Sequence, residues 1–177
     1  MIEVEVKARI KYPKRAERSI IALGASPIGI EAQADTYYSA PYRDFAKTDE
    51  ALRIRVQDNK YFLTYKGHKM DSISKTRKEY EVEVNDADCM GNILSSLSFT
   101  PVATIVKKRK KYRLGDFIIS LDEVRNLGCY MEVEVSLRDS KSHEEKVESI
   151  FRLFEKLGIS RDESIRKSYL EMILEKS

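Results

Sequence analysis

The chain has no tryptophan, and it contains only two cysteines and two histidines among its 177 residues. Cys89 and Cys129 lie far apart without a CxxC motif, and neither His68 nor His143 has a metal-ligand spacing. These scarcities argue against a disulfide framework and against a zinc site built from Cys and His. We expect both cysteines to be reduced and buried.

Long apolar runs are also missing, since none approaches the roughly 18 residues of a membrane-spanning helix. Acidic residues begin at Glu3, which does not fit a secretory signal peptide. We therefore expect a cytoplasmic protein that makes no contact with membranes. The 32 basic and 29 acidic residues nearly cancel, so the net charge of +3 identifies no partner. The length predicts one domain, residues 1–177, with a substantial core.

The opening segment, MIEVEVKARI, alternates with a period of two. Its even positions are apolar, whereas Glu3, Glu5, Lys7 and Arg9 are charged. This pattern predicts a strand over 2–10 with one apolar face and one charged face. Further strands are predicted over 28–39, 52–56, 61–66, 78–84, 102–114, 117–124 and 129–137.

Helices are predicted between groups of these strands. One begins at Pro13, a second is capped by Asn85 or Asp86, and a third follows a capping box at Ser142. A last helix is expected from near Ser160 to the C-terminus. Because most neighbouring strands are joined as hairpins, the sheet should be antiparallel, and about eight strands suffice to close a small barrel. The predicted fold class is α+β: an eight-stranded antiparallel closed β-barrel with flanking helices.

The charged faces of these strands are almost fully ionised, and their signs separate by strand. A sheet half exposed to water would explain any one strand alone. It does not explain the whole set, because a solvated face normally mixes Ser, Thr and Gln with its charges. Clustered carboxylates favour a hard divalent cation, and stacked Arg and Lys favour an anion with several charges. Together they fit a metal–polyphosphate complex inside the barrel. The apolar positions on the opposite faces include Tyr80 and Val82, and Tyr80 should pack in the core or at the rim.

A run of five basic residues, KKRKK at 107–111, supports a different interpretation. Such a patch is typical of nucleic-acid binding. Strict alternation places Lys108 and Lys110 on the outer face, where they would lie at an uncovered rim. An RNA-binding barrel therefore stays open as an alternative, although it leaves the acidic strands unexplained.

The segments that carry these charges resemble, in order, those of the CYTH superfamily. E-x-E-x-K at residues 3–7 resembles its signature, and QADTYY (33–38) and EALRIR (50–55) resemble its next segments. Six further segments follow in family order up to residue 173: TYKG, RKEYEVEV, VKKR, SLDEV, LGCYMEVEV and RKSYLEMI. The superfamily is named for class IV adenylyl cyclases and thiamine triphosphatases, and it also includes inorganic triphosphatases.

The resemblance implies a triphosphate tunnel metalloenzyme that uses Mg²⁺ or Mn²⁺. It places Glu3, Glu5, Asp122, Glu132 and Glu134 at the metal. It places Lys7, Arg53, Arg55, Lys66, Lys107 and Arg109 at the phosphates. Glu5, Lys7, Asp122 and Glu132 would be catalytic, and Arg77, Glu79, Glu81 and Lys167 would also line the tunnel.

Phosphoryl chemistry depends on positioning and charge neutralisation, so one tunnel could serve two reactions. Water attack on the terminal phosphate would hydrolyse tripolyphosphate, a nucleoside triphosphate or thiamine triphosphate. Attack by the ribose 3′-oxygen of ATP would instead give cyclic AMP and pyrophosphate. Hydrolysis is favoured because it needs fewer specific groups. A non-catalytic polyphosphate or nucleotide binder is a further alternative. The expected partner is a triphosphate-containing small molecule rather than a nucleic acid, with a homodimer as an expected assembly.

Overall fold

A computed structural model describes residues 2–70, 76–137 and 142–177. Within these residues nine strands form one sheet, and all of its pairings are antiparallel. The strands are β1 (Ile2–Arg9), β2 (Ser26–Ser39), β3 (Ala51–Gln57), β4 (Lys60–Lys66), β5 (Arg77–Val84), β6 (Thr100–Leu114), β7 (Phe117–Val124), β8 (Gly128–Leu137) and β9 (Ser164–Ile165). The helices are α1 (Pro13–Ala22), α2 (Phe45–Thr48), α3 (Ala87–Ser96), α4 (His143–Lys156) and α5 (Tyr169–Lys176), with a 3₁₀ turn at Arg161–Glu163.

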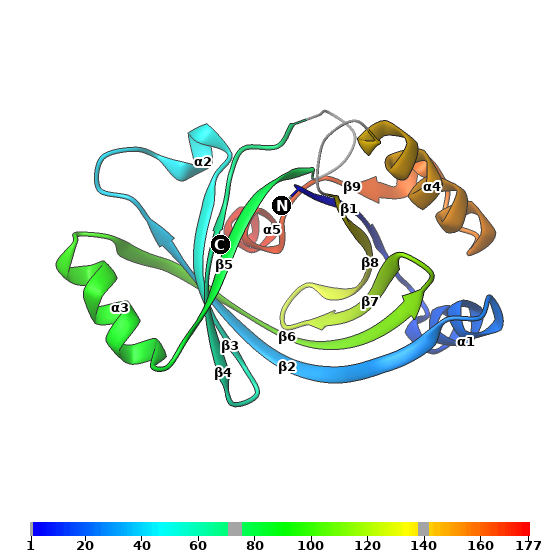
Figure 1. Cartoon of the computed structure of the whole chain (residues 1–177), viewed down its shortest axis with the longest axis horizontal. Helices are drawn as coiled ribbons and strands as arrows, with labels where there is room; N and C mark the ends of the chain where they lie inside the picture. Colours follow the sequence, from blue (N-terminus) through cyan, green and yellow to red (C-terminus); the bar gives the residue numbers. More distant parts are fainter. Residues whose placement is uncertain (1, 71–75, 138–141) are drawn as a thin grey trace.

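The first eight strands close into a barrel, which confirms the predicted fold. Their order is β5-β4-β3-β2-β6-β7-β8-β1, and β5 returns to β1 through Ile2↔Lys78 and Glu3↔Arg77. The alternation of each strand divides its side chains between two faces: most apolar side chains face outward, many of them beneath helices, and most charged side chains face the interior. Figure 1 shows α1 and α4 outside one wall and α2 and α3 outside the opposite wall.

Three apolar clusters attach the helices to the barrel. The largest packs Ile150, Phe151 and Phe154 of α4 on the outer side chains of β1, β7 and β8, including Val4 and Val133. A second lies under α2 and α3, around Phe45 and Leu94. The third holds α5 against Tyr37, Ile105, Val124 and Tyr130, which come from four barrel strands. Because α5 touches so many strands, it lies across one end of the barrel.

Several sequence expectations about the periphery are wrong. The last helix does not begin near Ser160, because the capping box of Ser160 and Glu163 starts only a 3₁₀ turn. The chain then pairs with β1 as β9, and Ser168 caps the helix that follows. Ser142 precedes α4 as expected, but its side chain makes no capping hydrogen bond.

One expectation about burial is also wrong. Cys89 is exposed and Cys129 is half-buried, so the cysteines do not belong to the core. Tyr80 and Val82 on the outer face of β5 are more than half exposed, because α3 packs over β3 and leaves this face uncovered. Among the described residues, no helix has the length and apolarity needed to cross a membrane.

Candidate active site

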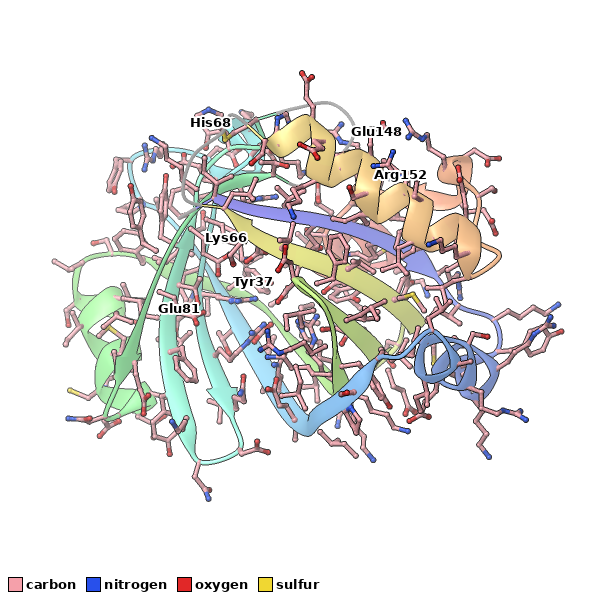
Figure 2. The ribbon with its side chains drawn as sticks, turned by 45° about the vertical axis from the view of Figure 1, so that its right-hand side comes forward. Tyr37, Lys66, His68, Glu81, Glu148 and Arg152 are labelled. Carbon is pink, nitrogen blue, oxygen red and sulfur yellow. The ribbon has the colours of Figure 1, made fainter. Side chains whose placement is uncertain are left out.

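The interior of the barrel is a cavity of about 560 Å³. This volume falls in the range of small-molecule sites. Nearly every residue predicted to bind metal or phosphate lines it, on β1, β3, β4, β6 and β8. Asp122 on β7 stands behind these residues and contacts one of them. In Figure 2, Tyr37, Lys66 and Glu81 lie on the barrel strands, whereas Glu148 and Arg152 lie on the outside of α4.

Three carboxylates converge on one wall of the cavity. Glu5 on β1 is directly opposite Glu134 on β8, and Glu3 precedes Glu5 on the same face. One oxygen from each of the three lies within 4.8 Å of the others. Burial raises the pKa of Glu134 to about 7, and the negative charge of Glu3 acts in the same direction. Burial and the neighbouring Glu79 also raise the pKa of Glu3, although Lys66 opposes them. A group of mutually repelling oxygen ligands matches the preference of a hard divalent cation.

A second group surrounds the guanidinium of Arg109 on β6. Its Nε and Nη2 donate to the two oxygens of Asp122 at 2.7 and 2.5 Å, and Nη2 also donates to Glu132. The other oxygen of Glu132 lies 3.3 Å from Nζ of Lys7, which is almost completely buried. Burial opposes the charge of Arg109, but Asp122 and Glu132 outweigh it and raise the pKa of the guanidinium.

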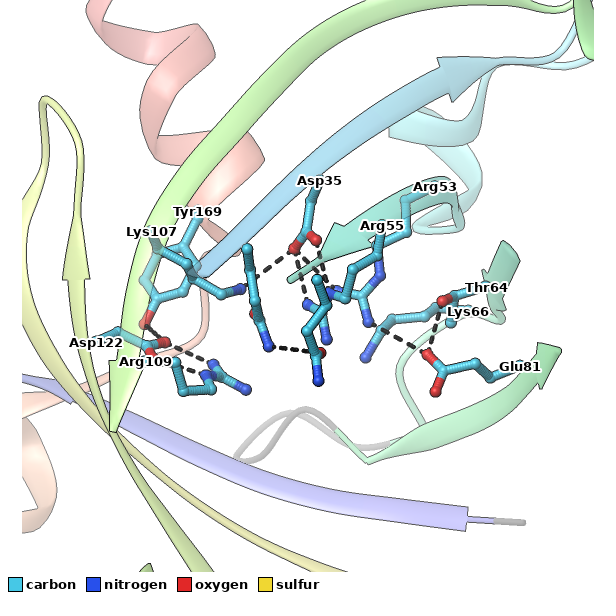
Figure 3. A network of polar contacts seen from close by, with 12 residues as sticks. Asp35, Arg53, Arg55, Thr64, Lys66, Glu81, Lys107, Arg109, Asp122 and Tyr169 are labelled. Carbon is cyan, nitrogen blue, oxygen red and sulfur yellow. Dashed lines mark hydrogen bonds and ion pairs between the residues drawn. The ribbon is translucent and has the colours of Figure 1, made fainter. Parts of the chain in front are cut away.

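The carboxylate of Asp35 on β2 is the centre of a third group, shown in Figure 3. Arg55 binds it with two parallel hydrogen bonds of 2.6 and 2.8 Å. Arg53 Nη1 and Lys107 Nζ approach within 3.3 and 3.2 Å. Burial would raise the pKa of Asp35, yet the three cations hold it well below its usual range. Burial lowers the pKa of Lys107 to about 8, against the attraction of Asp35.

Lys66 on β4 forms ion pairs both with β5 and with the wall of the cavity that carries Glu3, Glu5 and Glu134, which is called the acidic wall below. Its Nζ lies 2.7 Å from Glu79 and 3.4 Å from Glu3. Arg53 faces the same side, with Nη2 at 3.9 Å from Glu79 and 3.8 Å from Glu81. Glu81 also accepts a hydrogen bond of 2.8 Å from Thr64. Glu79 and Glu81 therefore line the cavity beside cations, and Glu79 also interacts with Glu3 of the carboxylate cluster.

Three predicted residues have surroundings that differ from the expectation. Both oxygens of Asp122 are engaged by Arg109 or Tyr169, so it stands apart from the carboxylates that could share a cation. Arg77 lines the cavity, but its guanidinium donates to the backbone carbonyl of Gly67 at 3.3 Å. The Lys167 side chain points away to Glu175 at 2.7 Å and is mostly exposed, so it does not line the cavity.

Sequence reasoning missed two buried residues in these groups. Asp35 lies between Gln33 and Tyr37 on the inward face of β2, where the period-two pattern could have identified it. Because Gln33 and Tyr37, its neighbours on the same face, are neutral, the sequence of β2 does not show a charged face. Tyr169 lies in the segment that resembles the closing helix of the family. No pattern in the sequence indicates that its hydroxyl reaches Asp122 on β7.

The basic run at 107–111 is divided between the two sides of β6. Lys107, Arg109 and Lys111 face the cavity. Lys110 points outward and pairs with Glu17 of α1 at 2.8 Å, while Lys108 is exposed. No continuous basic face results, so the structure removes the main observation behind the RNA-binding alternative.

The cavity thus combines an acidic cluster with buried cations that suit phosphate, and sequence and structure comparisons agree with this. A CYTH domain model matches residues 1–169, so the chain belongs to the CYTH domain family. It is 42% identical over 172 residues to a Methanocaldococcus jannaschii protein provisionally named adenylate cyclase MJ0240, covering 97% of this chain and 98% of that one.

Two other proteins are also similar to this chain. The structure of the PH1819 protein from Pyrococcus horikoshii OT3 is similar, with a TM-score of 0.92, 39% identity and 99% of each chain covered. The adenylate cyclase CyaB of Aeromonas hydrophila is 24% identical over 170 residues, which cover 94% of this chain and 86% of that one. Family membership makes a triphosphate-containing substrate and a divalent cation the expected ligands.

Proposed function

We propose that this protein is a divalent-metal-dependent enzyme that hydrolyses triphosphate-containing substrates. The observation that carries the proposal is the meeting of the Glu3, Glu5 and Glu134 carboxylates, in one enclosed cavity, with buried lysines and arginines from several strands. A metal–triphosphate complex carries both charges that this lining attracts, whereas an uncharged ligand would gain nothing from either group.

The three clustered carboxylates are the residues that would hold Mg²⁺ or Mn²⁺. They offer only oxygen ligands, and burial, together with the charges of neighbouring carboxylates, raises the pKa values of Glu3 and Glu134, so a bound cation would stabilise their charged forms. When bound, such a cation neutralises phosphate charge and lowers the pKa of a coordinated water. We assign Asp122 and Glu132 instead to orienting Arg109 and Lys7, since these are the groups they contact.

The triphosphate would bind to the predicted set Lys7, Arg53, Arg55, Lys66, Lys107 and Arg109. Each of these cations contacts a carboxylate, so substrate binding exchanges a carboxylate partner for a phosphate oxygen. Arginine favours this exchange because its planar group can bind two oxygens at once. In the enclosed cavity the fixed cations stabilise the charge that develops on the phosphate oxygens without having to reorganise. Glu5, which lies directly opposite Glu134 in the pairing of β1 with β8, is the carboxylate of this cluster to which we assign a catalytic role.

Cyclisation of ATP to cyclic AMP and pyrophosphate is the second candidate. The specific observation in its favour is the name of the 42% identical relative and of CyaB, both of which are called adenylate cyclases. The two reactions would share the cation and the phosphate-binding residues, and they differ in which phosphorus faces the nucleophile. A polyphosphate or nucleotide binder that catalyses neither reaction is the third possibility. The assembly of the protein as a homodimer stays a prediction.

A product assay separates these possibilities. Purified protein is incubated with Mg²⁺ or Mn²⁺ and, separately, with tripolyphosphate, ATP and thiamine triphosphate, and the products are resolved by ion-exchange chromatography. Free phosphate supports the proposal and ranks the substrates, whereas cyclic AMP with pyrophosphate establishes the cyclase. Binding without product would favour the third possibility, and absence of binding would refute the site. A Glu5→Gln variant controls for a contaminating phosphatase.

A further inference from the structure

The segment before α5 is attached directly to a predicted phosphate-binding residue. In β9, Ile165 pairs with Lys7 of β1, and the ammonium group of Lys7 donates a hydrogen bond of 3.1 Å to the backbone carbonyl of Lys167. Ser168 then caps α5 by a reciprocal pair of hydrogen bonds with Glu171. The capping box fixes where the helix begins, so the first helical residue, Tyr169, enters the barrel at a defined place.

Tyr169 is 5% exposed and contacts charged groups from three strands. Its hydroxyl donates to Oδ2 of Asp122 at 2.8 Å, as Figure 3 shows. Nζ of Lys7 lies 3.8 Å from the centre of its ring, and Nζ of Lys107 lies 5.3 Å from it. The edge of the ring packs against Tyr130, with 5.2 Å between centroids. One side chain of α5 thus contacts a carboxylate on β7 and lysines on β1 and β6.

Each contact restrains a group that the proposed function needs. The buried ammonium group of Lys7 contacts a carbonyl, a carboxylate and the face of an aromatic ring, and these contacts restrain its position. Asp122 is shared between Tyr169 and Arg109, so fixing this carboxylate also fixes the guanidinium. Burial and the charges of Glu132 and Asp122 raise the pKa of Tyr169 well above its ordinary value, which keeps the phenol protonated as a donor.

We propose that Tyr169 is a positioning residue: its ring orients the ammonium group of Lys7, and its hydroxyl orients Arg109 through Asp122. The C-terminal segment therefore sets the geometry of two phosphate-binding cations. This inference rests on the proposed function, because it requires a triphosphate to occupy the cavity.

The test uses two substitutions that separate the two contacts. Tyr169→Phe keeps the ring beside Lys7 and removes the hydroxyl, whereas Tyr169→Leu removes both. Tyr112→Phe is the matched control, because Tyr112 is also buried and its hydroxyl also binds a carboxylate, Glu17, outside the barrel. Tripolyphosphate affinity is measured by calorimetry without metal, kcat and KM are measured with Mn²⁺, and circular dichroism verifies the fold of every variant.

We expect Tyr169→Leu to weaken tripolyphosphate binding by about thirtyfold, the size of a desolvated cation–π contact. Tyr169→Phe should weaken it by about threefold, because Arg109 still binds Asp122. Tyr112→Phe should leave the affinity unchanged. If the ring acts through Lys7, the double variant Lys7→Ala/Tyr169→Leu should bind only about threefold more weakly than Lys7→Ala alone, because only the loss of the hydroxyl contact with Asp122 is left.

Full additivity of the Lys7 and Tyr169 losses would overturn the inference, because a residue that only supports the fold has no reason to depend on Lys7. If Tyr169→Leu does not fold, the isosteric Tyr169→Phe variant decides, and an affinity and kcat/KM equal to those of Tyr112→Phe would overturn the inference. Wild-type protein that neither binds nor hydrolyses tripolyphosphate, ATP or thiamine triphosphate would refute the proposed function, and the inference would fall with it. If the wild-type protein is active and the Tyr169 variants have the same affinity and kcat/KM as the wild type, the inference is refuted and the proposed function stands.

Discussion

Glu134→Gln should make the metal-free protein more stable while it abolishes stabilisation by metal. The native state holds the Glu134 carboxyl with its pKa raised from 4.5 to about 7 by burial and by neighbouring carboxylates. Each tenfold change in proton affinity is worth about 1.4 kcal/mol, so the charged form costs the native state about 3 kcal/mol above pH 7. Because the pKa is raised in the folded protein, stability is fully present below about pH 4.5 and is lost as the pH rises through 7.

Chemical denaturation at about pH 8 with a chelator measures this effect. Wild-type protein should lose about 2 to 3 kcal/mol of unfolding free energy between pH 5 and pH 8 through this group, and Glu134→Gln should keep most of it. Added Mn²⁺ should restore the wild-type stability, by about 2.7 kcal/mol at a hundredfold excess over Kd, and should not act on the variant.

The control is Glu144→Gln, which removes an exposed charge from the first turn of α4. It should show the wild-type pH dependence and the wild-type response to Mn²⁺, with a change of only a few tenths of a kcal/mol from the helix dipole. Equal stability of Glu134→Gln and wild type at both pH values would refute the claim that the acidic wall is electrostatically strained. An unchanged response of Glu134→Gln to Mn²⁺ would refute its place at the metal.

Three further measurements test other parts of the site. Glu5→Gln should abolish turnover and leave the melting temperature unchanged or higher, because it relieves repulsion in the same cluster. A melting temperature lowered by several degrees, with residual activity, would return this residue to a structural role. Because burial lowers the pKa of Lys107 to about 8, binding of tripolyphosphate at pH 8 should take up protons. Calorimetry in buffers of different ionisation enthalpy detects this uptake, and a binding enthalpy that does not depend on the buffer would remove Lys107 from the phosphate contacts. Asp35→Asn should destabilise the protein by about 3 to 5 kcal/mol in urea unfolding, because it leaves Arg53, Arg55 and Lys107 without their shared counter-ion, and a loss below about 1 kcal/mol would contradict this.

The sequence alone determined the barrel and most of its lining. A period of two in β1, β5 and β8 assigns each side chain to one of two faces, so Glu3, Glu5, Glu132 and Glu134 had to share the face opposite the apolar residues. The hairpin links made the sheet antiparallel. These are local properties, which a strand fixes through its own backbone geometry.

The tertiary structure decided which charged groups meet. The closure of β5 on β1 brings Lys66 to Glu3, residues that are 63 positions apart, and the register of β6 against β7 places Arg109 beside Asp122. Asp122 therefore lies against an arginine rather than among the clustered carboxylates. The sequence could not show this, because the partner of an inward-facing charge depends on the shear of the closed barrel and not on the pattern within any one strand.

The C-terminal segment is the clearest example of the same limit. Ser160 and Ser168 both begin capping boxes, and only packing against the barrel decides that the first ends after one 3₁₀ turn while the second begins α5. Two residues of β9 pair with β1 between them, a contact that spans nearly the whole chain. Local capping chemistry is present in the sequence, whereas the long-range pairing that selects among the caps exists only in the folded protein.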